Sequence, residues 1–110
     1  MSTNCPASGF RTDAPARHSS LRSAGYGYIC TVGRFPDGRI GEIFLAHHNS
    51  NSAADTNARD SAIVCSIALQ CGADIETLRK ALTRDAQGRP GGPLGAAVDR
   101  LCEGGGMSSE

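Results

Sequence analysis

The sequence predicts an α+β fold, in which a small antiparallel sheet of two or three strands packs against two helices plus a short third helix. Two observations lead to this prediction. Residues 26–46 alternate between apolar and polar positions on both sides of a turn, which is typical of a β-hairpin. Three later segments carry apolar residues at helical spacing. Because an isolated hairpin is only marginally stable in water, we expect the helices to cover it.

One face of the hairpin is predicted to be buried. Successive strand residues point to opposite faces of a sheet. The turn at residues 35–38 reads Phe-Pro-Asp-Gly, in which proline presets φ, aspartate bonds nearby amides and glycine accepts a positive φ. The expected buried positions are Tyr28, Cys30 and Val32 before the turn, and Ile43 and Leu45 after it.

The ends of the chain are expected to lie outside the packed unit. Residues 1–24 predict a mobile tail, rich in Ser, Ala, Pro and Arg, with an edge strand at residues 17–23. Residues 25–103 form the predicted domain, and residues 104–110, which follow a run of glycines, are expected to fray. The length of 110 residues has room for one domain.

Capping residues place the three helices. The first is predicted at residues 57–71, with Asp55 or Thr56 as its N-cap and Gly72 after its end. This helix is apolar on most sides, which indicates a central position. Asp74 caps a second helix at residues 75–83, and Pro93 opens a third helix that the glycines at 104–106 end.

Composition argues against several classes of partner. The 11 basic and 11 acidic residues cancel, so the chain lacks the basic footprint of a nucleic-acid-binding protein. No apolar run approaches the roughly 20 residues of a membrane span, and the N-terminus lacks the order of a signal peptide. We therefore expect a cytoplasmic protein that binds neither nucleic acid nor membrane.

Five cysteines are an odd number, so they cannot all pair with one another, and no C-x-x-C spacing occurs. Scattered cysteines in a cytosolic chain are usually reduced and pack as small hydrophobes. A zinc or thiol redox role is the alternative.

The order of these features resembles a known family. A strand ending in TVG, the turn FPDGR, the strand EIFL, the segment NARDSAIVCSIALQCGADIETLRKALTR and the ending GPLGAAVD are similar to the TSCPD domain. That domain forms the C-terminal part of vitamin B12-dependent ribonucleotide reductases and also occurs as short free-standing bacterial proteins. The resemblance covers residues 26–101; the Thr-Ser-Cys-Pro-Asp signature itself is absent.

The resemblance implies a non-catalytic accessory or interaction domain linked to deoxyribonucleotide synthesis. Its expected partner is a ribonucleotide reductase or another protein, and no cofactor is expected. A chain this short cannot supply the barrel that ribonucleotide reduction requires, so reductase turnover by the chain alone is not expected. A homodimer is one of the oligomeric states left open.

The alternative function is a small-ligand or nucleotide/phosphate-binding module. The polar stretch before the first helix offers amides and hydroxyls near a helix N-terminus, where an anion is favoured. The competing interpretation is that these residues simply cap the helix. The candidate ligand-binding residues are His48, Asn49, Ser50, Asn51, Ser52 and Arg59.

No catalytic or metal-binding constellation is predicted. His47 and His48 are adjacent, so at a strand end they point to opposite faces, one packed and one solvated, and cannot chelate one metal without a bend. Glu42 lies among apolar neighbours. It is either a buried acid with a raised pKa or an exposed carboxylate paired with Arg34 or Arg39.

Overall fold

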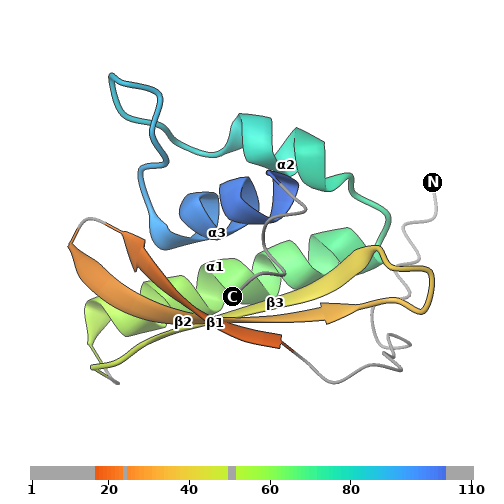
Figure 1. Ribbon diagram of the computed structural model, residues 1–110, viewed down its shortest axis with the longest axis horizontal. Helices are drawn as coiled ribbons and strands as arrows, with labels where there is room; N and C mark the ends of the chain where they lie inside the picture. The colour runs from red at the N-terminus through yellow and green to blue at the C-terminus, as the bar shows by residue number, and fades with distance from the viewer. Residues whose placement is uncertain (1–16, 24, 50–51, 104–110) are drawn as a thin grey trace.

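A three-stranded antiparallel sheet and three helices make up the fold, which confirms the α+β prediction (Figure 1). The structure is a computed structural model that describes residues 17–23, 25–49 and 52–103. The strands are β1 (Arg17–Ser23), β2 (Tyr26–Arg34) and β3 (Ile40–His47), in the order β1-β2-β3. The helices are α1 (Ala53–Gln70), α2 (Ile75–Ala81) and α3 (Pro93–Cys102). The expected tail at residues 1–16 and the expected fraying at 104–110 lie outside the described residues.

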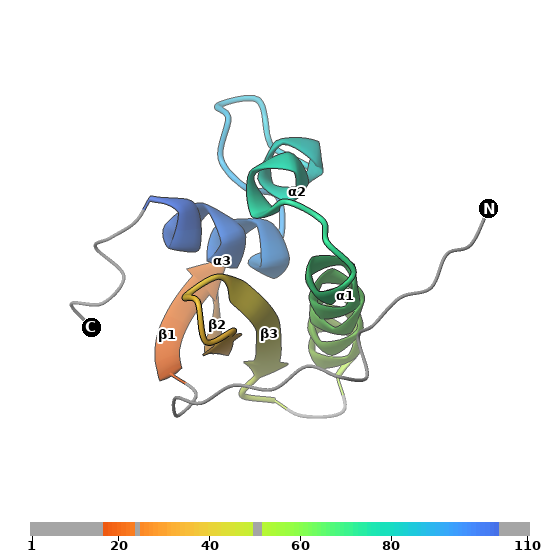
Figure 2. The same ribbon diagram turned by 90° about the vertical axis from the view of Figure 1, so that its right-hand side faces the viewer.

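The inner face of the sheet carries the core. The alternation of the hairpin is confirmed, because Tyr28, Cys30 and Val32 are buried on β2. They pair with inward-facing residues of both neighbouring strands. Helix α3 lies across the concave side of the curved sheet, and α1 lies alongside β3 (Figure 2). The other buried apolar residues are Leu21, Ile43 and Leu45 on the sheet, Ala58, Ala62, Cys65 and Leu69 on α1, and Ala97, Val98 and Leu101 on α3.

Helix α1 closes the outer edge of β3 with polar side chains. The Ser66 hydroxyl accepts a hydrogen bond from the backbone N–H of Ile43 and donates one to the carbonyl of the same residue, both at 2.9 Å. The Gln70 amide donates to the carbonyl of Gly41. These side chains pair peptide groups of an edge strand that would otherwise be open. The small residues on the inner side of α1 allow this close approach.

The helix boundaries differ from the prediction mainly at the start of α1, and α2 ends at Ala81 rather than at residue 83. Ser52, rather than Asp55 or Thr56, is the N-cap of α1, so the helix begins four residues earlier than predicted, at Ala53. The sequence offered several capping residues in a row, and the choice depends on where β3 ends. Asp74 caps α2 and Pro93 occupies the first turn of α3, both as predicted.

The same five-residue turn occurs twice, at residues 35–39 and 85–89. In each turn the first N–H donates to the fifth carbonyl, and the fourth residue is a glycine with φ of 97° or 82°. The arginine before each turn, Arg34 or Arg84, donates to that glycine's carbonyl. The first turn joins β2 to β3, and the second lies between α2 and α3. The second turn lacks the proline that marks the first turn in the sequence.

An ion-pair network ties α2 to α3. Both oxygens of the Asp99 carboxylate accept hydrogen bonds from Arg84, and Arg79 of α2 adds a third at 3.2 Å. The Arg84 hydrogen bonds are the main reason that the pKa of Asp99 is lowered. Helix α2 has no fully buried residue; its partly buried Ile75 and Leu78 pack against the core, and these charges add to its attachment. None of the described helices has the length and apolarity needed to span a bilayer.

Candidate functional site

The described residues of the predicted anion-binding stretch are hydrogen-bonded to neighbouring groups of the fold. The Ser52 hydroxyl accepts from the Asp55 N–H at 3.1 Å and donates to the carbonyl of Asn49 at 2.8 Å. The Asn49 N–H in turn donates to Nδ1 of His47. Ser50 and Asn51 lie outside the described residues. The arrangement is that of a helix cap, which was the competing interpretation of this stretch.

Arg59, the cation expected at this site, serves an internal carboxylate. Its Nε lies 2.8 Å from Oδ2 of Asp55, which is 3% exposed. The other Asp55 oxygen accepts the N–H of His47 at 2.9 Å. The Arg59 guanidinium also lies over the Phe44 ring, 5.2 Å from its centroid. Arg59 therefore joins the start of α1 to the end of β3 and to the outer face of the sheet.

The two adjacent histidines are placed as one packed and one exposed residue. His47 is buried and His48 is exposed, yet their rings stack with centroids 4.5 Å apart because β3 ends at His47. The Tyr28 ring meets His47 edge-on. Within the described part of the chain, Nε2 of His47 has no hydrogen-bond partner. The described residues contain no group of three His, Cys, Asp or Glu side chains that could hold a metal ion.

Glu42 is exposed on the outer face of the sheet, and the arginines expected beside it point elsewhere. Arg39 pairs with Asp37 within the turn, and Arg34 donates to the carbonyl of Gly38. The interpretation of Glu42 as a buried acid is therefore wrong. The strand alternation puts Glu42 on the face opposite Ile43, which is buried.

The described cysteines are poorly suited to nucleophilic chemistry. Cys30, Cys65 and Cys102 are free thiols, and the first two are buried. Burial raises the pKa of the Cys30 thiol to about 11 and raises that of Cys65 as well. A protonated, buried thiol is a weak nucleophile and metal ligand. Cys71 is disulfide-bonded, so the expectation that the cysteines are reduced is wrong for this residue.

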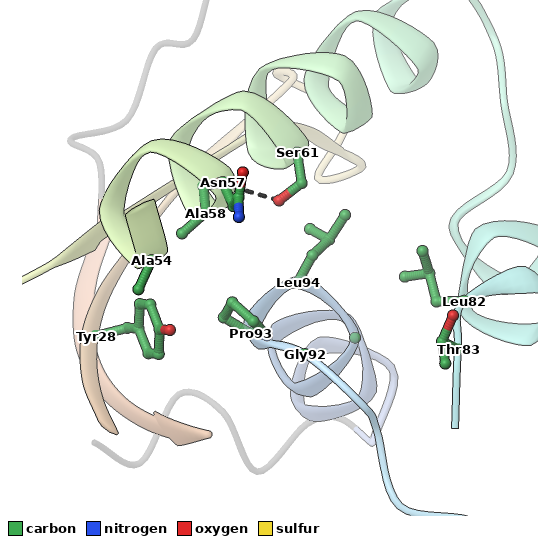
Figure 3. Close-up of a pocket in the computed structure, with 11 residues that line it drawn as sticks. Tyr28, Ala54, Asn57, Ala58, Ser61, Leu82, Thr83, Gly92, Pro93 and Leu94 are labelled. Atoms are coloured by element: carbon green, nitrogen blue, oxygen red, sulfur yellow. Dashed lines mark hydrogen bonds between the residues drawn. The ribbon is translucent and has the colours of Figure 1, made fainter. Parts of the chain in front are cut away.

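A groove runs between α1 and α3 (Figure 3). Its volume is about 380 Å³, within the range of small-molecule sites. Tyr28 stands at one end and Leu82 and Thr83 at the other, with Asn57 and Ser61 projecting from α1. None of its lining residues is charged. The groove therefore suits an uncharged group and offers no cation to a phosphate.

Exposed apolar side chains follow the opposite, outer side of the molecule. We call Ile29, Phe44, Ile63 and Ile67 the outer band; their exposed fractions are 49%, 38%, 50% and 48%. Ile29 pairs with Ala46 on β3, which makes Phe44 its diagonal neighbour on the same face. Because Arg59 lies over Phe44, the i, i+4 row of Arg59, Ile63 and Ile67 runs beside this face. The band thus continues from the sheet onto α1.

The outer band was not recognised in the sequence. Ile63 and Ile67 belong to the apolar sides that predict a central first helix, but α1 flanks β3 and leaves them exposed. A signal was present, because residues 63, 64 and 67 lie on the side of the helix opposite Ala58, Ala62 and Leu69.

Comparisons with protein-family models, with curated proteins and with solved structures find no match to this chain.

Proposed function

We propose that this chain is a non-catalytic interaction domain that docks on a protein partner through the outer band. The band is the observation that supports the proposal. It joins four large apolar side chains, each more than a third exposed, across a sheet face and a neighbouring helix. Clustered exposed apolar residues on a small protein mark interaction surfaces more often than scattered ones do. The other surfaces described above offer no comparable grouping.

The resemblance to the TSCPD domain suggests which partner to test first. The partner that this resemblance implies is a B12-dependent ribonucleotide reductase. An association with that enzyme would link the chain to deoxyribonucleotide synthesis. Such a partnership requires a cytoplasmic location, where protein thiols are kept reduced. The Cys71 disulfide is not expected in such a location. The oxidation state of Cys71 in protein isolated with its thiols blocked therefore checks this part of the proposal directly.

Binding to the purified reductase, measured by calorimetry, tests the proposal. Phe44→Ser and Ile67→Ser should each weaken binding at least about tenfold, because truncation of an apolar anchor at an interface costs more than about 1 kcal/mol. Tyr26→Ser is the matched control, since Tyr26 is 54% exposed but belongs to the inward-facing set of β2. Undetectable binding rejects the reductase as the partner. Equal binding by all three variants rejects the outer band as the docking surface.

A second candidate function rests on the groove between α1 and α3. Its neutral lining favours an uncharged small ligand, such as a heterocyclic ring with hydrogen-bonding groups, over a free phosphate. A ligand that binds only the folded state raises the melting temperature. Adenosine should therefore stabilise the chain more than inorganic phosphate does, and Ser61→Leu, which fills the groove, should abolish the shift. A larger shift with phosphate would contradict this assignment.

A further inference from the structure

The two edges of the sheet are treated differently by the fold. The edge of β3 is closed by α1, through the hydrogen bonds of Ser66 and Gln70. The edge of β1 has no strand beside it among residues 17–23, 25–49 and 52–103. A strand edge with unpaired peptide groups is a template for another extended segment.

The hydrogen-bonding pattern identifies the outward groups of β1. Odd-numbered residues of β3 bond outward to α1, so the even-numbered ones bond β2. By the register of the two ladders, even-numbered residues of β2 then bond odd-numbered residues of β1. The peptide groups of His18, Ser20 and Arg22 are left facing the open edge. An independent contact agrees, because the carbonyl of Ser20 accepts a hydrogen bond from Arg100 of α3.

The charge at this edge is of one sign. Strand β1 contains Arg17, His18 and Arg22 and no acidic residue. Arg100 adds a fourth basic group from α3. Beside the end of the strand, a hollow of about 510 Å³ is lined by Arg22 and Arg89, with Asp85 as the acidic residue in its lining. Asp85 is already paired with Arg89.

We propose that the open edge of β1 binds an extended acidic segment of a partner protein as a fourth strand. This inference rests on the proposed function as an interaction domain, and it adds a second surface and the chemistry of what binds there. Main-chain hydrogen bonds to the three outward residues supply the attachment. Carboxylates of the segment pair with Arg22 and Arg100. On binding, the Arg100 guanidinium leaves the carbonyl of Ser20 and pairs with a carboxylate of the segment.

A second copy of the chain is a poorer occupant. The antiparallel register that pairs most of β1 with itself is centred on Ser20 and sets Arg22 opposite His18. Basic residues directly opposite one another destabilise a strand pair when both are charged, and they gain nothing when histidine is neutral. An acidic strand in the same place sets a carboxylate against Arg22 in place of a second basic side chain.

Fluorescence anisotropy with a labelled peptide tests the proposal. The probe is an acetylated peptide of about eight residues that alternates valine and glutamate, a length typical of a strand. We expect saturable binding that weakens at least about tenfold between 50 mM and 500 mM salt, because the charges are exposed. A peptide with lysine in place of glutamate should bind at least about tenfold more weakly.

Substitutions at Ser20 separate edge pairing from simple charge attraction. Ser20→Pro removes an outward N–H while the bonds from β1 to β2, which use odd-numbered residues, are kept. It should abolish peptide binding with little change in melting temperature, whereas Ser20→Ala should bind as the unmodified chain does. Equal binding by the proline and alanine variants, or by the acidic and lysine peptides, would overturn the proposal. So would a dimer in sedimentation that Ser20→Pro dissociates.

The outer-band variants distinguish this proposal from the one on which it rests. Phe44→Ser should bind the acidic peptide normally, because Phe44 is on β3, two strands away from the β1 edge. Loss of peptide binding in Ser20→Pro together with retained reductase binding supports two separate surfaces. Absence of peptide binding by the unmodified chain, with reductase binding that still depends on Phe44, rejects the edge proposal alone.

Discussion

Asp55 shows how one side chain can link a strand to a helix. Its carboxylate lies in the first turn of α1, accepts the N–H of His47 at the end of β3, and pairs with Arg59 one turn further along. Asp55 is nearly inaccessible, and a buried carboxylate stabilises a fold only when its oxygens are bonded. The residue was predicted as a helix cap, and its actual role is to link strand and helix.

Replacement of Asp55 should therefore be costly. Asp55→Ala leaves the His47 N–H and the Arg59 guanidinium without this acceptor, and we expect it to lower the free energy of unfolding by about 3 kcal/mol. The measurement is urea denaturation followed by circular dichroism. Asp60→Ala, at an exposed position on the same helix, is the control and should change stability by less than about 0.5 kcal/mol. Similar values for the two variants would mean that Asp55 does not link the segments.

At the scale of the elements, the sequence was sufficient to predict which hairpin residues are buried, because each strand has one buried face. Tyr28, Cys30, Ile43 and Leu45 needed only period two to be placed correctly. The position of α1 relative to the sheet could not be predicted from the sequence in the same way. Its apolar residues are compatible with packing on a sheet face or beside a sheet edge, and the choice is made by long-range hydrogen bonds from Ser66 and Gln70. No local pattern encodes a partner 23 or 29 residues away.

The candidate site was predictable only in part. The sequence left two interpretations for the polar residues around Ser52, and the hydrogen bonds of Ser52 with Asn49 and Asp55 are those of a helix cap. The outer band required knowledge of which side of α1 faces β3. The free edge of β1 required the full register of the sheet.

Ser66 provides a direct test of how α1 joins β3. Ser66→Ala would leave the N–H and the carbonyl of Ile43 unpaired in a buried setting, and it should destabilise the fold by about 2 kcal/mol. Ser61→Ala is the matched control, since the Ser61 hydroxyl donates to the carbonyl of Ala58 within its own helix. Chemical denaturation of both variants is the measurement. A loss below about 0.5 kcal/mol for Ser66→Ala would show that water satisfies this edge equally well.

The network that holds α2 to α3 predicts a dependence on pH. Because the folded-state pKa of Asp99 is lowered, its stabilising effect is present above the unfolded-state pKa of about 4 and is lost as the pH falls through the lower folded-state value. A double-mutant cycle of Asp99→Asn and Arg84→Gln should give a favourable coupling energy at pH 7 that declines below about pH 4. A coupling energy that is constant from pH 7 to pH 2 would contradict the charged nature of this link.

At the scale of the whole molecule, the three helices leave one face and one edge of the sheet uncovered. Helix α3 occupies the concave face and α1 the β3 edge, while the described residues place no helix or strand over the outer face or beyond β1 (Figure 2). A single sheet with helices on one side is a common α+β solution, in which the other face meets solvent or a partner. The apolar outer band and the basic β1 edge make these two open regions chemically distinct.

Amide hydrogen exchange measures this asymmetry of the two edges in one experiment. An amide exchanges slowly when its hydrogen bond must open first. The N–H of Ile43 is held by Ser66 and that of His47 by Asp55, so both should be protected although they face away from the sheet. The outward amides of His18, Ser20 and Arg22 should exchange at least about tenfold faster in the same sample. Ser66→Ala should accelerate Ile43 and leave Ser20 unchanged. Protection of Ser20 equal to that of Ile43 in the unmodified chain would mean that the β1 edge is already covered, and the fourth-strand site would then be unavailable to a partner.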